Sequence, residues 1–413
     1  MVSPPSLPPS DPKDEDCEEQ FDDHGFALPP KGDSVGDSSR EYARWFEPKA
    51  LRRLGRFELR RKRLADPGEW STIPKNALKA MLRKGVPTEH RKEVWWSVLD
   101  CEARRKREPR SYAEHLQQAQ QVVAVKTAEE IERDLQRTFP NHRNFRVASG
   151  QAELRNVLSA FAHHSPRVQY CQGLNFIAAL LLAVLKEEEM AFWALVCAVE
   201  TLGVERYYTE GMTLLRADMR ALGILLERKC PKVARIFTAT GVDLMSVSSE
   251  WFITWFAKSL PVSTTLRVWD TLFFEGFKVL FRVAIGVFKL VEPEILRCRS
   301  FEDVMEQAKA WPRHMVKHNE LLKASFKGVP GLRRMDLLKV RDDALCRVER
   351  EDAEQQKRHL ECRERLARER AARQAAAAAD VKQQPTDASA APAAPPMGGA
   401  TLASAAPSQP DGY

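Results

Sequence analysis

The chain has 413 residues, of which 44% are hydrophobic and 29% are charged, values that are ordinary for soluble globular proteins. The longest apolar run, residues 176–185, is far shorter than the roughly 20 residues that a membrane-spanning helix needs, so a transmembrane protein is excluded. The net charge of +7 is unevenly spread, because residues 1–40 contain ten acids and only three bases. No signal peptide precedes the apolar segments, and the eight cysteines lack zinc-binding spacing, so we expect a cytoplasmic protein with reduced thiols.

Residues 1–40 are rich in Pro, Asp, Ser and Gly, a composition that predicts a disordered acidic tail. Residues 41–78 are predicted to form a basic helical lead-in, since seven Arg and Lys residues crowd into positions 52–63. This basic cluster has two interpretations: a solvated helix face, or a surface for a phosphate-bearing partner such as an acidic membrane. Nucleic acid is not expected, because aromatic residues are not interleaved with the bases.

Residues 79–330 show helical spacing of apolar residues between successive prolines, and convincing alternating strand patterns are absent. The fold class is therefore predicted to be all-α. The clearest stripe runs from Leu280 to Val291, and the run 176–185 is apolar on every side, which predicts a buried central helix.

Residues 331–375 are predicted to form a long exposed helix. Ten bases and nine acids lie between Arg341 and Arg373, with too few apolar positions for a strong coiled coil. Residues 376–413 consist mainly of Ala, Pro, Ser and Gln and are predicted to be a second disordered tail.

The sequence contains none of the common nucleotide-binding loops, zinc-binding helices or nucleophile elbows. His163 and His164 are adjacent, but neighbouring helical side chains point in different directions and no third ligand is evident. We therefore expect no metal and no cofactor of the chain's own.

Residues 127–140 have the features of a short helix with a defined start and end. Thr127 and Glu130 have capping-box spacing, Pro140 closes the segment, and Arg137 is expected in the last turn. A structural explanation for Arg137 is available, because a cation near a helix C-terminus is stabilising and Asp134 is placed to pair with it.

Residues 170–175 form a polar turn directly before the most hydrophobic helix. Gln172 is expected near that helix N-terminus, and Gly173 is expected to permit the turn. Here too a structural explanation exists, since Gln172 or Asn175 could simply satisfy free amides at the helix start.

Together the two segments resemble the signature of the TBC domain family, GTPase-activating proteins for Rab GTPases. Further motifs of the family occur in the same order along residues 80–290. The matching residues are Ile131, Asp134, Arg137 and Thr138; Tyr170, Gln172 and Gly173; Arg83–Pro87 with Trp95; and Trp251, Phe252, Trp255, Phe256, Pro261, Arg267, Trp269, Asp270, Glu275 and Gly276.

The resemblance implies a TBC domain over residues 79–330 and a mechanism that uses two residues acting in trans. Arg137 would enter the nucleotide site of a GTP-bound Rab protein, and Gln172 would position the attacking water. Asp134 would orient Arg137, Asn175 would brace the turn of Gln172, and Tyr170 and Gly173 would complete that motif. GTP and Mg²⁺ would belong to the partner.

The resemblance also implies a role in vesicle trafficking. It does not explain the basic cluster, and a separate hypothesis is that this cluster holds the protein at acidic endomembranes. The alternative is a Rab-binding scaffold of the same fold that does not accelerate hydrolysis. Arg267 and Asp270, spaced to pair on one helix face, are expected to be structural.

Overall fold

The structure is a computed structural model that describes residues 21–28, 33–64 and 70–383. Within these ranges the chain is helical with connecting turns, and only two isolated β-bridges and no strand occur. The predicted all-α fold is confirmed. The chain divides into two compact units, Met1–Glu351 and Asp352–Tyr413.

The helices of the described ranges follow one another in this order, with η marking 3₁₀-helices: α1 (Ser34–Leu64), η1 (Trp70–Thr72), α2 (Lys75–Lys84), α3 (Thr88–Val98), α4 (Cys101–Arg107), α5 (Tyr112–Val122), α6 (Val125–Leu135), α7 (Ala148–His164), α8 (Leu174–Leu185), α9 (Glu188–Leu202), η2 (Glu205–Tyr207), η3 (Glu210–Met212), α10 (Thr213–Lys229), α11 (Pro231–Thr240), α12 (Leu244–Ile253), α13 (Val262–Glu275), α14 (Lys278–Leu290), α15 (Glu292–Ile295), α16 (Phe301–Ala308), α17 (Ala310–Arg313), α18 (His318–Phe326) and α19 (Arg334–Gln383).

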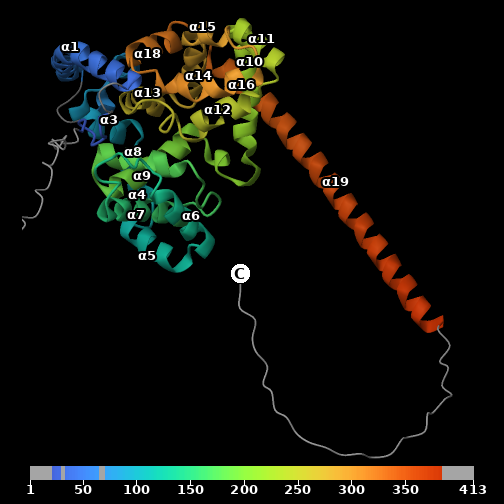
Figure 1. Ribbon diagram of the computed structural model, residues 1–413. Coiled ribbons are helices and arrows are strands. Elements are labelled where there is room, and N and C mark those ends of the chain that lie inside the picture. Colours follow the sequence, from blue (N-terminus) through green and yellow to red (C-terminus); the bar gives the residue numbers. More distant parts are fainter. Residues whose placement is uncertain (1–20, 29–32, 65–69, 384–413) are drawn as a thin grey trace, which may run out of the picture. The chain divides into compact units, whose positions relative to one another are not determined.

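The first unit is built around helices that are apolar on most sides. Every residue of α8 is buried, as its continuous apolar sequence predicts, and α8 packs against α7 and α9. Helices α4 to α9 lie together at one end of this unit, and α10, α11, α14, α15 and α18 lie together at the other (Figure 1). Helix α13 joins the two groups, because it packs against α9 of the first group and against α14 and α18 of the second. It also packs against α2 and α3.

A single buried carboxylate ties α13 to the start of the domain. Asp270 is completely buried and accepts hydrogen bonds from the Val86 amide (2.9 Å), Arg91 Nε (3.1 Å), Trp95 Nε1 (3.2 Å) and Arg267 Nη1 (3.2 Å). The predicted structural pair of Arg267 and Asp270 is confirmed. Four donors satisfy a charge that would otherwise be costly to bury.

A second ion pair fastens α2 to the end of α13. Arg83 binds the Glu275 carboxylate through two nitrogens, Nε at 2.5 Å and Nη2 at 2.8 Å. Lys278 Nζ lies 3.1 Å from the same carboxylate. The pKa of Glu275 is lowered overall, because these cations outweigh the opposing effect of burial.

The predicted boundaries need correction at the N-terminus. Residues 21–28 are packed against the domain, and α1 already begins at Ser34, so the predicted disordered tail 1–40 is wrong for these residues. Residues 1–20 lie outside the described ranges. The cause is a set of contacts with distant residues, which composition alone does not reveal.

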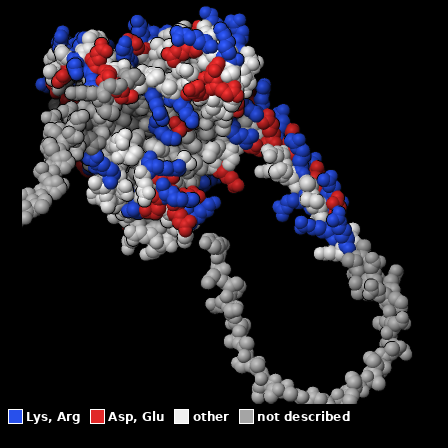
Figure 2. All heavy atoms as spheres, in the orientation of Figure 1, with Lys and Arg blue, Asp and Glu red and all other residues white. Residues whose placement is uncertain are grey.

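The helix α19 extends across the division between the units. In the first unit its Arg341 binds Asp218 through two nitrogens, at 2.6 and 2.8 Å. In the second unit, Leu360 and Leu366 are exposed, and charge pairs such as Arg368 with Glu364 occur along the helix. Figure 2 shows Lys, Arg, Asp and Glu interspersed on this helix, as its sequence predicts. The helix reaches Gln383, so the predicted disordered tail is wrong for residues 376–383. Residues 384–413 lie outside the described ranges.

Among the helices of the described ranges, none combines the length and the apolar character that crossing a membrane requires.

Asp270 gives a direct test of this architecture. Asp270→Asn removes the charge that compensates the buried Arg91 and Arg267, and we expect the free energy of unfolding to fall by about 3–5 kcal/mol. Urea denaturation followed by circular dichroism measures this change. Glu132→Gln is the control, because Glu132 pairs with Arg155 on the surface, where such a pair contributes about 0–1 kcal/mol. Equal losses in the two variants would contradict the role of Asp270.

Candidate functional site

Arg137 lies in a turn immediately after α6, not in its last helical turn as expected. Helix α6 ends at Leu135 and begins at Val125 without a side-chain cap, so the predicted capping box of Thr127 and Glu130 is also wrong. Thr127 lies inside the helix, where its hydroxyl donates to Gln169 Oε1 at 3.0 Å. A helix cannot continue through this segment, because Pro140 has no amide to donate and disfavours the helical conformation at Phe139.

The buried carboxylate of Asp134 forms an ion pair with the exposed guanidinium of Arg137. Its Oδ1 lies 2.5 Å from Arg137 Nη2, and its Oδ2 accepts a hydrogen bond of 2.5 Å from the Tyr170 hydroxyl. The Asp134 side chain is 6% exposed, whereas that of Arg137 is 51% exposed. The guanidinium is therefore anchored at one edge and open to solvent over much of the rest.

Tyr170 remains a hydrogen-bond donor at any physiological pH. Burial, followed by the hydrogen bond to Asp134, raises the pKa of its phenol well above the usual value. The Tyr170–Asp134 hydrogen bond joins the two predicted segments, which are 36 positions apart in the sequence.

Asn175 makes a second connection between the same two segments. Its Nδ2 donates to the Thr138 hydroxyl at 2.7 Å, and its Oδ1 accepts from the Gly173 amide at 2.9 Å. Thr138 Oγ1 in turn donates to the Asp134 carbonyl at 2.5 Å. Asn175 is fully buried and uses both ends of its amide, so it braces the turn of Gln172 against the loop of Arg137.

Gln172 is exposed and lies just before the N-cap of α8, as expected. Gly173 has a φ of 115°, a conformation that L side chains rarely adopt, which explains the glycine in this turn. The neighbouring Cys171 thiol has its pKa raised to about 11 by burial and by the nearby Glu130 and Asp134 carboxylates, so it is protonated at neutral pH. The two exposed side chains, Arg137 and Gln172, thus stand on loops that buried hydrogen bonds connect.

Two residues of the site were given no role by the sequence. Thr138 is part of the motif, but only the structure shows that its hydroxyl joins Asn175 to the Asp134 carbonyl. Phe139 has a φ of 46°, which is strained for a bulky residue and has no obvious sequence signal except the following Pro140.

The structure brings together histidines that the sequence leaves apart. His115, His164 and Glu108 have potential ligand atoms within 4.8 Å of one another, and His115 Nδ1 lies 2.9 Å from His163 Nδ1. The assumption that His163 and His164 lack a third neighbour is therefore wrong. Arg104 Nη1 donates to Glu108 at 2.8 Å and already neutralises it. Burial lowers the pKa of His115 to about 4. The absence of a metal remains a prediction.

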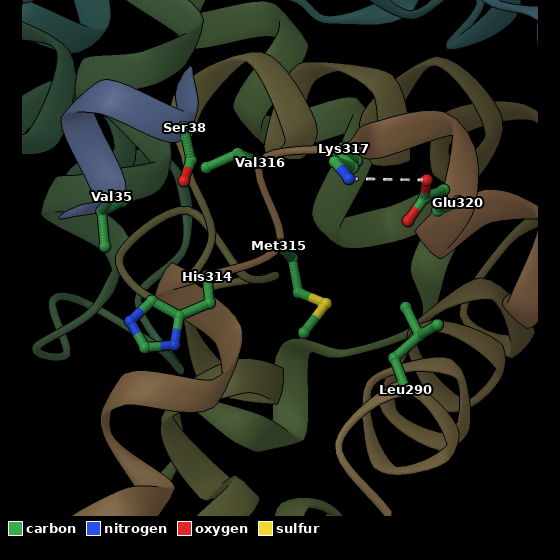
Figure 3. A pocket seen from close by; sticks show the side chains of 8 residues that line it. All are labelled: Val35, Ser38, Leu290, His314, Met315, Val316, Lys317 and Glu320. Carbon is green, nitrogen blue, oxygen red and sulfur yellow. Dashed lines mark ion pairs between the residues drawn. The ribbon is translucent and has the colours of Figure 1, made fainter. Parts of the chain in front are cut away.

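A hollow of about 460 Å³ lies elsewhere on the first unit, between α1, the end of α14 and the segment from α17 to α18 (Figure 3). None of the predicted site residues lines it. Its lining consists of Val35, Ser38, Leu290, His314, Met315, Val316, Lys317 and Glu320. The candidate site is instead an exposed surface, which suits a protein partner.

Known proteins are similar to this chain over much of its length. The Rab-GTPase-TBC domain model matches residues 88–296. TBC1 domain family member 2A of Homo sapiens is 38% identical over 70% of this chain and 31% of that protein. Growth hormone-regulated TBC protein 1 of Homo sapiens is 36% identical over 70% of this chain and 84% of that protein, and its Xenopus laevis counterpart is 40% identical over 56% and 68%.

Two solved structures share the fold. The Chlamydomonas flagellar RabGAP TBC domain has a TM-score of 0.63 and 28% identity, covering 75% of this chain and 99% of that one. The Ypt/Rab-GAP domain of Gyp1p has a TM-score of 0.56 at 20% identity, covering 67% and 98%. The chain belongs to the Rab-GTPase-TBC domain family. The chain spans 84% of human growth hormone-regulated TBC protein 1, whereas it spans about a third of human TBC1 domain family member 2A.

The hydrogen bond between Tyr170 and Asp134 can be tested by stability. Tyr170→Phe leaves one buried oxygen of Asp134 without its donor, and we expect the free energy of unfolding to fall by about 1–3 kcal/mol. Urea denaturation measures the change. Tyr112→Phe is the control, because its hydroxyl donates to the less buried Glu188. A loss no greater than that of the control would show that the Asp134 oxygen finds another donor.

Proposed function

We propose that this chain accelerates GTP hydrolysis by a Rab-family GTPase, with Arg137 and Gln172 acting on the nucleotide of the GTP-bound partner. The observation that carries the proposal is the contrast in exposure at the site. Arg137 and Gln172 are open to solvent, while the Asp134, Tyr170 and Asn175 side chains that connect their loops are buried. A purely structural arginine has no need of an exposed guanidinium with a buried anchor.

The chemistry of phosphoryl transfer suits these two residue types. Negative charge spreads over the phosphate oxygens in the transition state, and the planar guanidinium of Arg137 offers several donors in a fixed arrangement. The ion pair with Asp134 limits the rotation of Arg137, so less conformational entropy is lost when the partner docks. The amide of Gln172 can accept from water and donate to a phosphate oxygen, which orients the nucleophile.

In this proposal the chain needs no cofactor of its own, because GTP and Mg²⁺ are part of the partner. It is not expected to hydrolyse nucleotides alone. Its role would be to regulate vesicle trafficking by switching off Rab proteins. The alternative of a Rab-binding scaffold is less favoured, since docking alone does not require both an exposed Arg137 and an exposed Gln172.

Single-turnover hydrolysis by a panel of GTP-loaded Rab proteins tests the proposal. Wild-type chain should accelerate at least one Rab. Arg137→Ala should reduce that acceleration by roughly 10³- to 10⁵-fold, and Gln172→Ala by roughly 10²-fold or more. Arg137→Lys should also fail, since an ammonium lacks the planar set of donors.

Arg133→Ala is the matched control, because Arg133 is an exposed arginine of α6 whose Nε bonds only to its own helix, at Glu129 O. Binding to each Rab loaded with a non-hydrolysable GTP analogue should persist in all variants. Binding without acceleration by the wild-type chain would leave the scaffold function in place of the proposed one.

We also propose that α1 holds the protein at acidic endomembranes. One side of α1 packs on the domain, where Tyr42 and Phe46 contact the His318 ring edge-on. Away from these contacts Trp45, Leu51 and Leu59 are 55%, 70% and 57% exposed, which is unusual for large apolar side chains. The bases exposed on the same helix are Arg44, Arg52, Arg56, Lys62 and Arg63. Apolar side chains interleaved with bases suit a membrane interface with anionic lipids.

Vesicle sedimentation tests this second proposal. The chain should bind vesicles rich in phosphatidylserine, bind phosphatidylcholine vesicles weakly, and dissociate at high salt. Replacing Arg52, Arg56, Lys62 and Arg63 by Ser should weaken binding by roughly 10²- to 10³-fold, since each base near an anionic surface contributes about 1 kcal/mol. Replacing the exposed Arg363, Arg365, Arg368 and Arg370 of α19 is the control for net charge. Equal effects of the two sets would contradict a specific role of α1.

A further inference from the structure

A short segment outside the matched family domain contacts the loop that carries Arg137. This segment, residues 21–28, lies well before the matched residues 88–296 in the sequence. It lies against residues 139–143, which directly follow Arg137 and Thr138. We call residues 21–28 the N-terminal clamp and residues 137–143 the arginine loop.

Backbone hydrogen bonds join the clamp to the arginine loop in an antiparallel arrangement. The Ala27 amide donates to Asn141 O, and the Arg143 amide donates to Gly25 O, each at 2.9 Å. Phe26 and His142 form the β-bridge between these bonds. The clamp therefore supplies hydrogen-bond partners for the Asn141 carbonyl and the Arg143 amide of the arginine loop.

The His142 side chain adds a third connection. The Asn144 amide donates to His142 Nδ1 at 3.2 Å, so the proton of the neutral ring is on Nε2, which donates to His24 O at 2.8 Å. The His24 ring lies 3.4 Å from Arg91 Nη1, and Arg91 binds the buried Asp270. The clamp is thus fastened both to the arginine loop and to the core of the domain.

The conformation of the clamp is itself specified by local interactions. Asp22 Oδ1 accepts from the amides of His24 and Phe26, each at 2.9 Å, which closes a tight turn. Gly25 has a φ of 88°, and a Cβ there would lie 2.9 Å from His142 Nε2. Glycine is therefore required both by the backbone and by the close approach of His142.

Aromatic contacts connect the clamp to the two segments that carry the exposed site residues. The Phe26 ring lies edge-on to Phe139, with 5.1 Å between centroids, and Phe139 lies edge-on to Phe176 of α8 at 5.3 Å. Phe139 is two residues after Arg137, and Phe176 is four residues after Gln172. Phe139 also has the strained φ of 46°, a conformation that persists only when neighbours hold it in place. Phe26 is one of these neighbours.

We propose that the N-terminal clamp is a positioning element for the proposed reaction: Phe26 and the backbone of residues 25–27 hold the arginine loop so that Arg137 is already placed when the GTP-bound partner docks. This inference rests on the proposed function. If the arginine loop had to become ordered during the reaction, the reaction would be slower, because the entropy cost of ordering the loop would add to the activation barrier. The clamp fixes the loop beforehand and does not touch the reacting atoms.

Phe26→Ala in the full-length chain tests the proposal. Removing the ring should lower the maximal single-turnover rate with the responsive Rab by roughly 10- to 10²-fold. The affinity for the same Rab loaded with a non-hydrolysable analogue should change little, since the clamp acts on Arg137 and not on docking. Phe26→Tyr keeps the ring and should restore most of the rate.

Phe21→Ala is the matched control, because Phe21 belongs to the same segment but its ring faces the Arg146 guanidinium at 5.1 Å. It should leave the rate near that of the wild type. Hydrogen exchange provides a readout independent of activity: the amides of Ala27 and Arg143 should exchange faster in Phe26→Ala, while those of α8 remain protected. A double variant with Phe139→Ala should lose less than the two single effects combined.

Several outcomes would contradict the proposed positioning role of the clamp. The first is a wild-type rate in the Phe26→Ala variant. The second is a loss of Rab affinity in that variant at an unchanged maximal rate, because this result would make residues 21–28 a docking surface. If the wild-type chain accelerates no Rab, the proposed function fails. Unchanged exchange at Ala27 and Arg143 would then still refute the clamp, whereas faster exchange would leave it as a structural contact without the proposed role in catalysis.

Discussion

The buried carboxylate of Asp270 organises this domain, because a charge removed from water must be matched by donors from its surroundings. Its donors come from α3, α13 and the turn before α3, so satisfying one carboxylate fixes the relative placement of segments about 180 positions apart. One of these donors, Arg91, also reaches His24, whose carbonyl binds His142. A continuous set of polar contacts thus runs from the centre of the domain to the loop of Arg137.

The candidate site is built with buried anchors and exposed ends. Asp134 uses one oxygen for Tyr170 and the other for Arg137, while Asn175 uses its amide oxygen for Gly173 and its nitrogen for Thr138. Each anchor is satisfied in the absence of a partner, so the loops need not rearrange to fill open hydrogen bonds. The side chains of Arg137 and Gln172 remain exposed, where a docking protein can reach them. This arrangement explains why the candidate site is an exposed surface.

Much of the fold was predictable, and the errors have a common physical origin. A helix-period stripe identified α14, and the continuous apolar run identified α8 and indicated its complete burial. Thr127 fitted a capping pattern but lies within α6, because its hydroxyl finds Gln169. His163 and His164 seemed isolated until α5 brought His115 beside them. In each case the deciding partner lies far along the chain, where local spacing gives no sign of it.

By itself the sequence determined the fold class, the family and the two segments, 127–140 and 170–175, that carry the candidate site residues. Apolar periodicity and short motifs are local properties of the chain, so they can be recognised without the structure. Only the tertiary structure decided that Asp134 holds Arg137 while bound to Tyr170, that Phe139 adopts a strained backbone, and that residues 21–28 pack on the arginine loop. These features depend on contacts between segments whose composition gives no sign of one another. Packing in three dimensions, where burial makes an unsatisfied polar group costly, selects those partners.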